Sequence, residues 1–436
     1  MDRPRARAVR QQPSHQAPGA LRRLTTAALS GGLNVDRAVP ASFWRGGTSR
    51  ALLFREDDLN EFGPEQVDAI ILAALGSPDP DGRQIDGLGG GISSLSKAAV
   101  VGPAPSGSGA DVAFRFAQVE VTEPRVDFAG NCGNISAAVA PFAVNEGLVA
   151  ASGDSADVVV LSLNTGQRFR ASVPLRSGAY DPSGDFAIGG VPGTGARLQL
   201  EYPEADGSIG RGALPTGRAR EDVAVPGCGT VPVSIVDVGN PAVFVAATAL
   251  GSAEAASILP VALDAASAMQ GRLEHIRCEA AVRIGVAATA EEAARYHRTV
   301  PKVALVGAPV AYPTTGGGEV AAADVDLLVR LISMGRTHRT LAMTGAMACA
   351  AAAVIEGTVV SEVAGGTAAR PESRHVRLGH PAGVLALDVT AEHDAGSWRV
   401  PSLRMDRTAR EIMRGAVLVP QAHLDGAAWF ASGQSP

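Results

Sequence analysis

Lysine is almost absent from this 436-residue chain: of its 38 basic residues, only Lys97 and Lys302 are lysines. Arginine stays protonated at any working pH, whereas a partly desolvated lysine can lose its proton and act as a base. A chain that uses arginine almost everywhere keeps a lysine mainly where arginine cannot serve. Lys97 lies in a glycine- and serine-rich loop and is therefore the first candidate for chemistry. Lys302, in a Val-Pro-Lys-Val run, is interpreted as structural.

Paired cysteines, long apolar runs and blocks of positive charge are also missing. The four cysteines form no C-x-x-C pair, which argues against a disulfide framework or a zinc site and favours a reducing, cytoplasmic compartment. No run of about 18 apolar residues is free of charges and turn residues, so no transmembrane helix is expected. A net charge of −6 without a long basic run in the body argues against nucleic acid as a partner.

Aromatic residues are scarce, at 4%, while glycine is abundant, at 51 residues. The core must therefore be built from Ala, Val, Leu and Ile, which suits tightly packed strands and helices of small residues. The length predicts two domains. Residues 1–37 carry several arginines among Gln, Pro and Ala without a continuous apolar stretch, which predicts a disordered leader rather than a secretory signal.

Two parts of the body share one order of elements: strands, then a polar turn, then a helix of small residues. This order indicates a pseudo-symmetric pair of domains, with the Gly- and Pro-rich segment 203–230 as the crossing between them. Helices are expected at 64–75, 262–275 and 341–355, and after the turn at 131–134 as far as Glu146. Strands are expected at 41–44, 51–54, 112–121, 157–163, 167–173, 196–202, 231–236, 243–247, 281–287, 302–307, 325–333, 375–378, 384–389 and 413–419.

Several turns carry groups suited to binding a carboxylate and moving a proton. The segment 45–49 offers a guanidinium fork, glycine N–H groups and hydroxyls, although alone it also fits an ordinary hairpin turn. The segment 131–134 places Cys132 at a helix start, where free N–H groups stabilise anions and lower a thiol's pKa; a buried structural cysteine is the alternative. His338 lies at the start of the expected helix 341–355, and His380 lies in a glycine-rich turn. Each histidine could be a site residue or a structural residue.

Together these residues resemble the PrpF family, the 2-methylaconitate cis-trans isomerases and their relatives methylitaconate delta-isomerase, 4-oxalomesaconate tautomerase and aconitate isomerase. No single motif is decisive, but the matching stretches occur in the family's order over nearly all of the body. They are 45–49, 76–79, 84–90, 94–97, 131–134, 237–241, 379–383 and 407–410.

The resemblance implies an α/β (α+β) fold of two pseudo-symmetric domains similar to diaminopimelate epimerase. Each domain is expected to be a mostly antiparallel sheet wrapped around a central helix, with the active site in the cleft between the domains. The expected boundaries are 38–205 with 411–425 for the first domain, where the C-terminal strand returns, and 206–410 for the second.

By the same resemblance, the family's active-site lysine is Lys97 and its cleft cysteine is Cys132, both catalytic. This chain departs from the family at Arg50, where a lysine is usual, and at Ala382, where a serine is common. Such changes flank the chemistry and bear on the substrate more than on the reaction. The expected substrate-binding residues are Arg45, Gly47, Thr48, Ser49, Ser94, Ser96, Asn131, Gly133, Asn134, Asn240, His338 and His380.

The expected function is a cofactor-independent isomerase of an unsaturated di- or tricarboxylic acid, without a metal. Lys97 would remove an allylic proton, giving cis-trans isomerisation or double-bond migration. The alternatives are a 4-oxalomesaconate-type keto-enol tautomerase, a two-base epimerase, and a non-catalytic carboxylate-binding protein that accompanies an aconitase-like enzyme. A small polycarboxylate is the expected partner, and a homodimer is left open.

Overall fold

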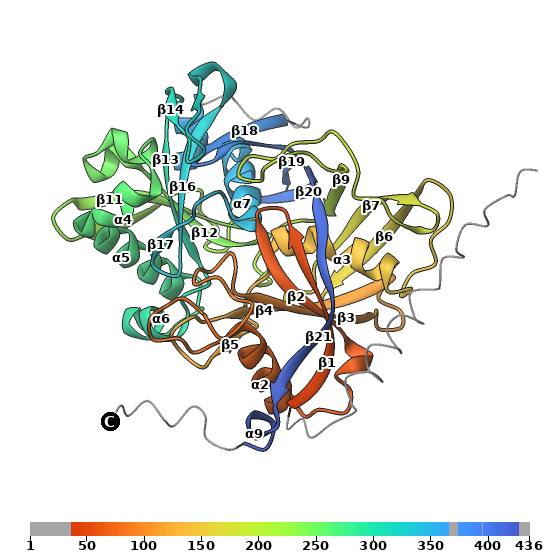
Figure 1. Cartoon of the computed structure of the whole chain (residues 1–436). Coiled ribbons are helices and arrows are strands. Elements are labelled where there is room, and N and C mark those ends of the chain that lie inside the picture. Colours follow the sequence, from red (N-terminus) through yellow and green to blue (C-terminus); the bar gives the residue numbers. More distant parts are fainter. Residues whose placement is uncertain (1–35, 366–373, 395, 427–436) are drawn as a thin grey trace, which may run out of the picture.

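The computed structural model describes residues 36–365, 374–394 and 396–426 (Figure 1), so nearly all of the expected leader lies outside the described residues. Nineteen strands join in one hydrogen-bonded sheet system, and a separate hairpin pairs β14 (Tyr312–Pro313) with β15 (Glu319–Val320). The nineteen are β1 (Asp36–Gly46), β2 (Ser49–Arg55), β3 (Lys97–Pro103), β4 (Val112–Val119), β5 (Val126–Asp127), β6 (Ser155–Ser162), β7 (Arg168–Arg176), β8 (Ala179–Tyr180), β9 (Leu198–Pro203), β10 (Glu221–Val225), β11 (Gly229–Val238), β12 (Asn240–Ala246), β13 (Lys302–Gly307), β16 (Leu327–Ser333), β17 (Arg336–Thr337), β18 (Arg374–His380), β19 (Gly383–Asp394), β20 (Ser397–Arg407) and β21 (Ala409–Pro420).

Proline and glycine mark the ends of one predicted helix. Helix α2 has the predicted bounds because Pro64 occupies its first position and Gly76 follows it with a left-handed φ of 70°. The helices are α2 (Pro64–Leu75), α3 (Gly133–Asn145), α4 (Pro260–Ala265), α5 (Ser267–Arg283), α6 (Ala290–Tyr296), α7 (Met343–Val354), α8 (Val359–Val363) and α9 (Gln421–Leu424).

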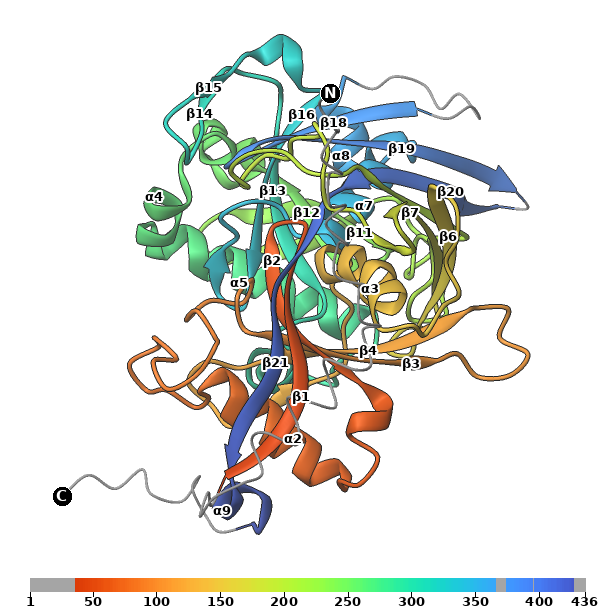
Figure 2. The same ribbon diagram turned by 45° about the vertical axis from the view of Figure 1, so that its right-hand side comes forward.

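Two helices, α3 and α7, are enclosed by strands (Figures 1 and 2). Every residue of α3 except the last, and all but the last of α7, is buried. Helix α3 packs against β1, β2, β6, β7, β8 and β21, while α7 packs against β11, β12, β18 and β19. Their small side chains permit this approach: a Cβ on Gly46 of β1 would lie 2.4 Å from the carbonyl oxygen of Asn134. The predicted mixed α/β fold is confirmed.

The strand pairings repeat around the two helices. Around α3, the hairpin β1–β2 is followed by β3, which pairs in parallel with β2 and antiparallel with β4, and β4 pairs in parallel with β6. Around α7, the hairpin β11–β12 is followed by β13, which pairs in parallel with β12 and antiparallel with β16, and β16 pairs in parallel with β18. In this repeat β3 and β13 are equivalent, and Lys97 and Lys302 are their first residues.

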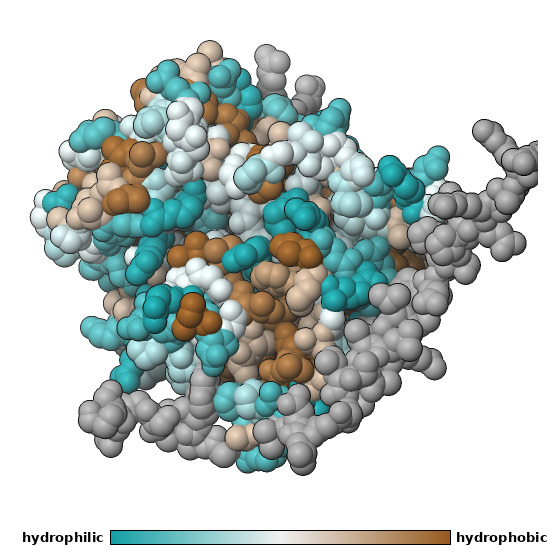
Figure 3. Space-filling view, viewed as in Figure 1, coloured by the Kyte–Doolittle hydropathy of each residue, from teal (hydrophilic) through white to brown (hydrophobic). Residues whose placement is uncertain are grey.

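Strand β21 pairs antiparallel with β1, the first described strand, over its whole length, and the extra residue Ile412 of β21 forms a bulge opposite Phe43 and Trp44. Three of its residues, Ile412, Met413 and Leu418, are exposed large hydrophobic side chains. Figure 3 shows apolar surface over the region of β1, β2 and β21. Apolar patches of this kind can serve as interfaces, but the homodimer stays a prediction.

Some sequence expectations are wrong. The expected strand at 281–287 is the end of α5 and the turn after it, because the small apolar residues Ala280 and Ala281 continue the buried face of that helix. Lys97 begins a strand rather than lying in a loop. Strands β10 and β20 and helix α6 were not predicted. No helix in the described part of the chain is long and apolar enough to cross a membrane.

Candidate active site

A small pocket of about 30 Å³ lies where α3 and α7 begin. The first turns of the two helices touch, since a Cβ on Gly133 would lie 2.2 Å from Cε of Met343 and 2.9 Å from its Cβ. The pocket is lined by Ser49, Ser93, Lys97, Phe116, Gln118, Gly130, Asn131, Cys132, Gly133, Asn134, Thr299, Lys302, Ser333, His338, Ala342, Met343 and Thr344.

Each hairpin turn reaches across to the segment that leads into the other helix. Asn240, at the start of β12, donates from Nδ2 to the carbonyl of Asn131 at 3.0 Å and accepts the Asn131 N–H at 3.3 Å. Thr340, just before α7, donates its hydroxyl to Thr48 of the β1–β2 turn at 2.9 Å. These reciprocal contacts hold the two helix starts together around the pocket.

The Lys97 amine is buried against neutral groups. It donates a short hydrogen bond to Oε1 of Gln118 and lies 5.1 Å from the centre of the Phe116 ring. Gln118 is oriented by its own donations to the carbonyls of Ser93 (3.1 Å) and Ser96 (2.9 Å), so its oxygen faces the amine. No described carboxylate lies within ion-pair distance of Lys97, and burial lowers the pKa of its amine below the ordinary value. The site thereby favours the neutral amine that a base requires.

Lys302 lines the same pocket. Its amine donates to the carbonyl of Thr299 at 3.1 Å, and the Thr299 hydroxyl donates to Asp127 at 2.7 Å. Burial, and then the charge of Lys97, lower the pKa of Lys302 to about 8, while Cys132 and Asp127 oppose the shift. At neutral pH Lys302 therefore remains mostly a cation.

His338 contributes a neutral imidazole. Burial, followed by the charge of Lys97, lowers its pKa to about 4. Its Nδ1 accepts the backbone N–H of Thr340 at 3.2 Å, which leaves the proton of the neutral ring on Nε2. His338 is thus a hydrogen-bond donor, and not an acid, at neutral pH.

The start of α3 is rich in groups that suit an anion. Cys132 is its N-cap, and the N–H groups of Gly133 and Asn134 are in the first turn, where no helical carbonyl can accept them. Near this helix start the buried hydroxyl of Ser49 has no partner, so it is free to donate to a bound carboxylate. Oδ1 of Asn134 is also without a partner, but as an acceptor it suits a donor and not a carboxylate.

The start of α7 is different. Ala342 and Met343 stand at its beginning, and its cysteine, Cys349, is fully buried in the helix with a raised pKa. Thr344 is the polar side chain that α7 adds to the pocket lining. One helix start therefore carries a thiol and the other does not.

The structure brings seven of the predicted site residues into the pocket and places seven elsewhere. Arg45 donates to the carbonyls of Gly47 (2.9 Å) and Thr408 (3.0 Å) and does not line the pocket, because the turn after β1 uses its guanidinium. Asn240 acts through Asn131. The seven in the pocket are Ser49, Lys97, Asn131, Cys132, Gly133, Asn134 and His338. Of the others, Gly47 forms the turn, Ser94 lines an adjoining cavity, Ser96 is buried against Gln84, and Thr48 and His380 line a further cavity.

Sequence reasoning missed Lys302, Gln118 and Thr344. Lys302 was interpreted as structural because its neighbours are strand formers, and only the repeat of strand pairings reveals its position. Gln118 lies on a predicted strand with no motif around it. The rarity of lysine was the one signal that could have found Lys302.

A larger cavity of about 330 Å³ adjoins the pocket and shares Ser93, Ser333 and His338 with it. Arg298, Arg336 and Arg339 also line it. Among the described residues, no group of three or more His, Cys, Asp and Glu side chains gathers as a metal site would require. The pocket and its larger neighbour thus place basic side chains beside an amine whose pKa burial lowers.

Comparison with known proteins gives a consistent result. The model of the PrpF protein family matches residues 36–420. The chain is 40% identical to a 2-methyl-aconitate isomerase of Cupriavidus necator over 88% of this chain and 97% of that protein. It is 38% identical to a 3-methylitaconate isomerase of Eubacterium barkeri, over 88% and 98%, and 37% identical to a 4-oxalomesaconate tautomerase of Pseudomonas putida, over 87% and 96%. The crystal structure of a methylitaconate-delta-isomerase superposes with a TM-score of 0.70 at 37% identity, covering 91% of this chain and 99% of that one.

Proposed function

Because the chain belongs to the PrpF family of isomerases, we propose that it isomerises an unsaturated di- or tricarboxylic acid, such as a 2-methylaconitate or an aconitate, without a cofactor. The observation that carries the proposal is the Lys97 amine, buried without a counter-ion beside the anion-binding start of α3. A neutral amine there meets the requirement for a base that acts on carbon next to a carboxylate.

In the proposed reaction, Lys97 Nζ takes a proton from the allylic carbon. The electron pair of the broken C–H bond becomes a new C=C bond, and the charge moves through the old double bond onto a carboxylate, giving a dienolate. The N–H groups of Gly133 and Asn134 and the hydroxyl of Ser49 would stabilise this anion. The Lys97 ammonium then returns the proton, either after rotation about the weakened bond or at the other end of the dienolate.

Lys302 has a different task in this proposal. It remains a cation at neutral pH, and it lies in the same pocket, so it would hold the developing negative charge. The neutral His338 would add a hydrogen bond from Nε2. Cys132, which lines the same pocket, would guide the returning proton.

The remaining carboxylates of the substrate would lie in the adjoining cavity of about 330 Å³. The pocket itself is much smaller, at about 30 Å³, and would receive the reacting end of the substrate. Arg298, Arg336 and Arg339 outnumber the two carboxylates in the lining, Asp81 and Glu120, so the larger cavity would suit a polycarboxylate.

We also propose that the fold is similar to diaminopimelate epimerase, with 38–205 and 411–425 as one domain and 206–410 as the other. The repeated strand pairings and the return of β21 to β1 support this division. All four cysteines are free, which supports a reducing, cytoplasmic location.

The test is proton NMR in D₂O with a panel of candidate substrates: cis- and trans-aconitate, the 2-methylaconitates, methylitaconate and 4-oxalomesaconate. We expect an aconitate, a 2-methylaconitate or methylitaconate to isomerise, with deuterium entering the allylic position. Turnover of 4-oxalomesaconate alone would favour the tautomerase. Deuterium exchange in none of them would contradict the proposal and favour a carboxylate-binding protein.

A further inference from the structure

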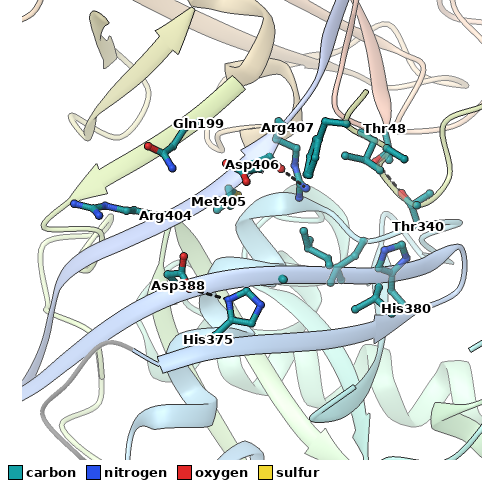
Figure 4. Close-up of a pocket in the computed structure, with 18 residues that line it drawn as sticks. Thr48, Gln199, Thr340, His375, His380, Asp388, Arg404, Met405, Asp406 and Arg407 are labelled. Atoms are coloured by element: carbon teal, nitrogen blue, oxygen red, sulfur yellow. Dashed lines mark hydrogen bonds and ion pairs between the residues drawn. The ribbon is translucent and has the colours of Figure 1, made fainter. Parts of the chain in front are cut away.

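Another cavity, of about 300 Å³, adjoins the Lys97 pocket at the contact between Thr48 and Thr340, and Arg407 lines it. We call it the Arg407 cavity. Figure 4 shows Thr48, Thr340, His380 and Arg407 toward one end of it. Strands β9, β18, β19 and β20 and the segment 186–189 form the walls. Its volume is that of a pocket for a small ligand.

The charged side chains in the cavity wall are paired, with one exception. Arg404 and Glu201 lie 2.8 Å apart, and His375 and Asp388 also lie 2.8 Å apart. Asp406 forms an ion pair with Arg197 at 3.1 Å. The exception is Arg407, for which the described residues provide no carboxylate within ion-pair distance.

Arg407 is buried and poorly satisfied. Only 4% of the residue is exposed, its one hydrogen bond is a 3.2 Å donation to the carbonyl of Asp406, and its Nε has no partner. Figure 4 shows its side chain directed into the cavity. A buried guanidinium without a counter-charge is costly, so the protein has kept a cation where an anion would complete it.

A second buried arginine shows what a structural role looks like. Arg330 is fully buried, yet its three nitrogens donate to the carbonyls of Ile258 (2.9 Å), Val329 (3.0 Å) and Ser257 (3.0 Å). It also lies 5.2 Å from the centre of the Tyr312 ring. The fold therefore satisfies one buried guanidinium with carbonyls and leaves the other to face a cavity.

We propose that the Arg407 cavity binds a small carboxylate through Arg407. The planar guanidinium can donate two parallel hydrogen bonds to a carboxylate. The hydroxyls of Thr48 and Thr340 line the same end of the cavity. His380 accepts the N–H of Ala382 on Nδ1 at 3.2 Å, so its neutral ring has a donor on Nε2.

The charge state at neutral pH supports this assignment. Burial lowers the pKa of Arg407 to about 10, which leaves it charged. Burial, and then the charge of Arg407, lower the pKa of His380 to about 3, which leaves it neutral. This end of the cavity thus holds a single positive charge, suited to one carboxylate.

The inference does not rest on the proposed isomerase chemistry, because the Lys97 pocket and the Arg407 cavity have no lining residue in common. The carboxylate could belong to the same molecule that reacts at Lys97 or to a separate one. Thr340, which hydrogen-bonds both Thr48 and Nδ1 of His338, would connect the occupied cavity to the pocket in either case.

The experiment is calorimetric titration of the protein with tricarballylate, a saturated tricarboxylate that cannot be isomerised. Arg407→Gln should weaken binding by at least about tenfold, as expected for the loss of a charged hydrogen bond. The matched control is Arg404→Gln, in the same strand and the same wall but exposed and paired with Glu201; it should change the affinity by less than about twofold.

Lys302→Gln, which removes the cation of the Lys97 pocket, separates the two sources of the carboxylate. If two molecules bind, the wild type takes up two equivalents, and Lys302→Gln and Arg407→Gln each weaken a different one. If one molecule occupies both sites, both variants weaken the same single binding event. Wild-type affinity and stoichiometry in Arg407→Gln would overturn the proposal.

Further measurements decide the case in which Arg407→Gln does not fold and test whether the ligand is a carboxylate. Circular dichroism and thermal melting establish whether Arg407→Gln is folded. If it is not, a crystal structure of the wild type with tricarballylate decides, and the absence of ligand density at Arg407 overturns the proposal. A wild type that binds inorganic phosphate there but not tricarballylate would overturn the assignment to a carboxylate.

Discussion

The two halves of this molecule place a lysine at the same point of the same strand pattern, but they surround it differently. Lys97, at the start of β3, meets the neutral oxygen of Gln118 and no described carboxylate. Lys302, at the start of β13, donates to a backbone carbonyl, and the negative charge of Asp127 favours its protonated form. The same position of a repeated fold thus has different neighbours in the two halves, and we propose that it holds a base in one and a cation in the other.

The residues at the starts of the two enclosed helices also differ between the halves. Cys132 and Asn134 stand at the start of α3, whereas Ala342 and Met343 stand at the start of α7. A two-base epimerase needs acid–base groups on opposite faces of its substrate. The start of α7 offers no thiol opposite Cys132, so a pair of cysteines does not supply these groups.

The largest effect is expected at Lys97. Lys97→Ala should lower kcat by about a thousandfold, because it removes the base. Its matched control is Lys302→Arg, which changes the only other lysine but keeps its charge and should keep most of the activity. Equal losses in the two variants, measured as initial rates on folded protein, would break the comparison between the halves.

Lys302 should control the alkaline limb of the pH profile. Lys302→Gln should lower kcat by about a hundredfold, the effect of losing one group that stabilises the developing anion. In the wild type, activity should fall as the pH rises through about 8, since Lys302 then loses its charge. Lys302→Arg should abolish this fall, because arginine stays protonated. A fall near pH 8 that persists in Lys302→Arg would assign it to another group.

The two cysteines offer a smaller contrast. Cys132→Ala should lower kcat by about tenfold if the thiol guides the returning proton. Cys349→Ala should leave kcat unchanged, because the side chain is fully buried within α7. Mass spectrometry should show that iodoacetamide modifies Cys132 before Cys349. Bound substrate should slow the modification of Cys132.

Arg45 should affect stability more than catalysis. Arg45→Gln removes charged hydrogen bonds to Gly47 and Thr408, which should cost about 2 kcal/mol in the free energy of unfolding. KM should remain near the wild-type value, because Arg45 does not line the pocket. Urea denaturation would measure the free energy of unfolding, and steady-state kinetics on the same samples would measure KM. A large rise in KM would show that Arg45 contributes to substrate binding.

Much of the fold could be predicted from the sequence where local signals agree. Helix α2 has the predicted bounds because proline and glycine mark its ends, and the small-residue run after Cys132 forms α3 as expected. The strand expected at 281–287 failed because a short apolar run does not distinguish a strand from the buried face of a helix.

The candidate site could be predicted only in part. Motifs indicated Lys97, Cys132 and Ser49, which the structure places in one pocket. For Lys302 the rarity of lysine was a signal, but its place in the pocket depends on a strand pairing between distant segments. Arg45 has the right chemistry for a carboxylate, but the carbonyl of Thr408, more than three hundred residues away, takes its guanidinium.

The measurement that tests the central claim most directly is deuterium incorporation from D₂O by Lys97→Arg, with the substrate that the wild type isomerises. Arginine keeps the positive charge of a protonated lysine but cannot accept a proton at neutral pH. If Lys97 is the base, the wild type incorporates deuterium at the allylic carbon, and folded Lys97→Arg neither exchanges nor isomerises. Exchange by Lys97→Arg at a rate near that of the wild type would contradict the account.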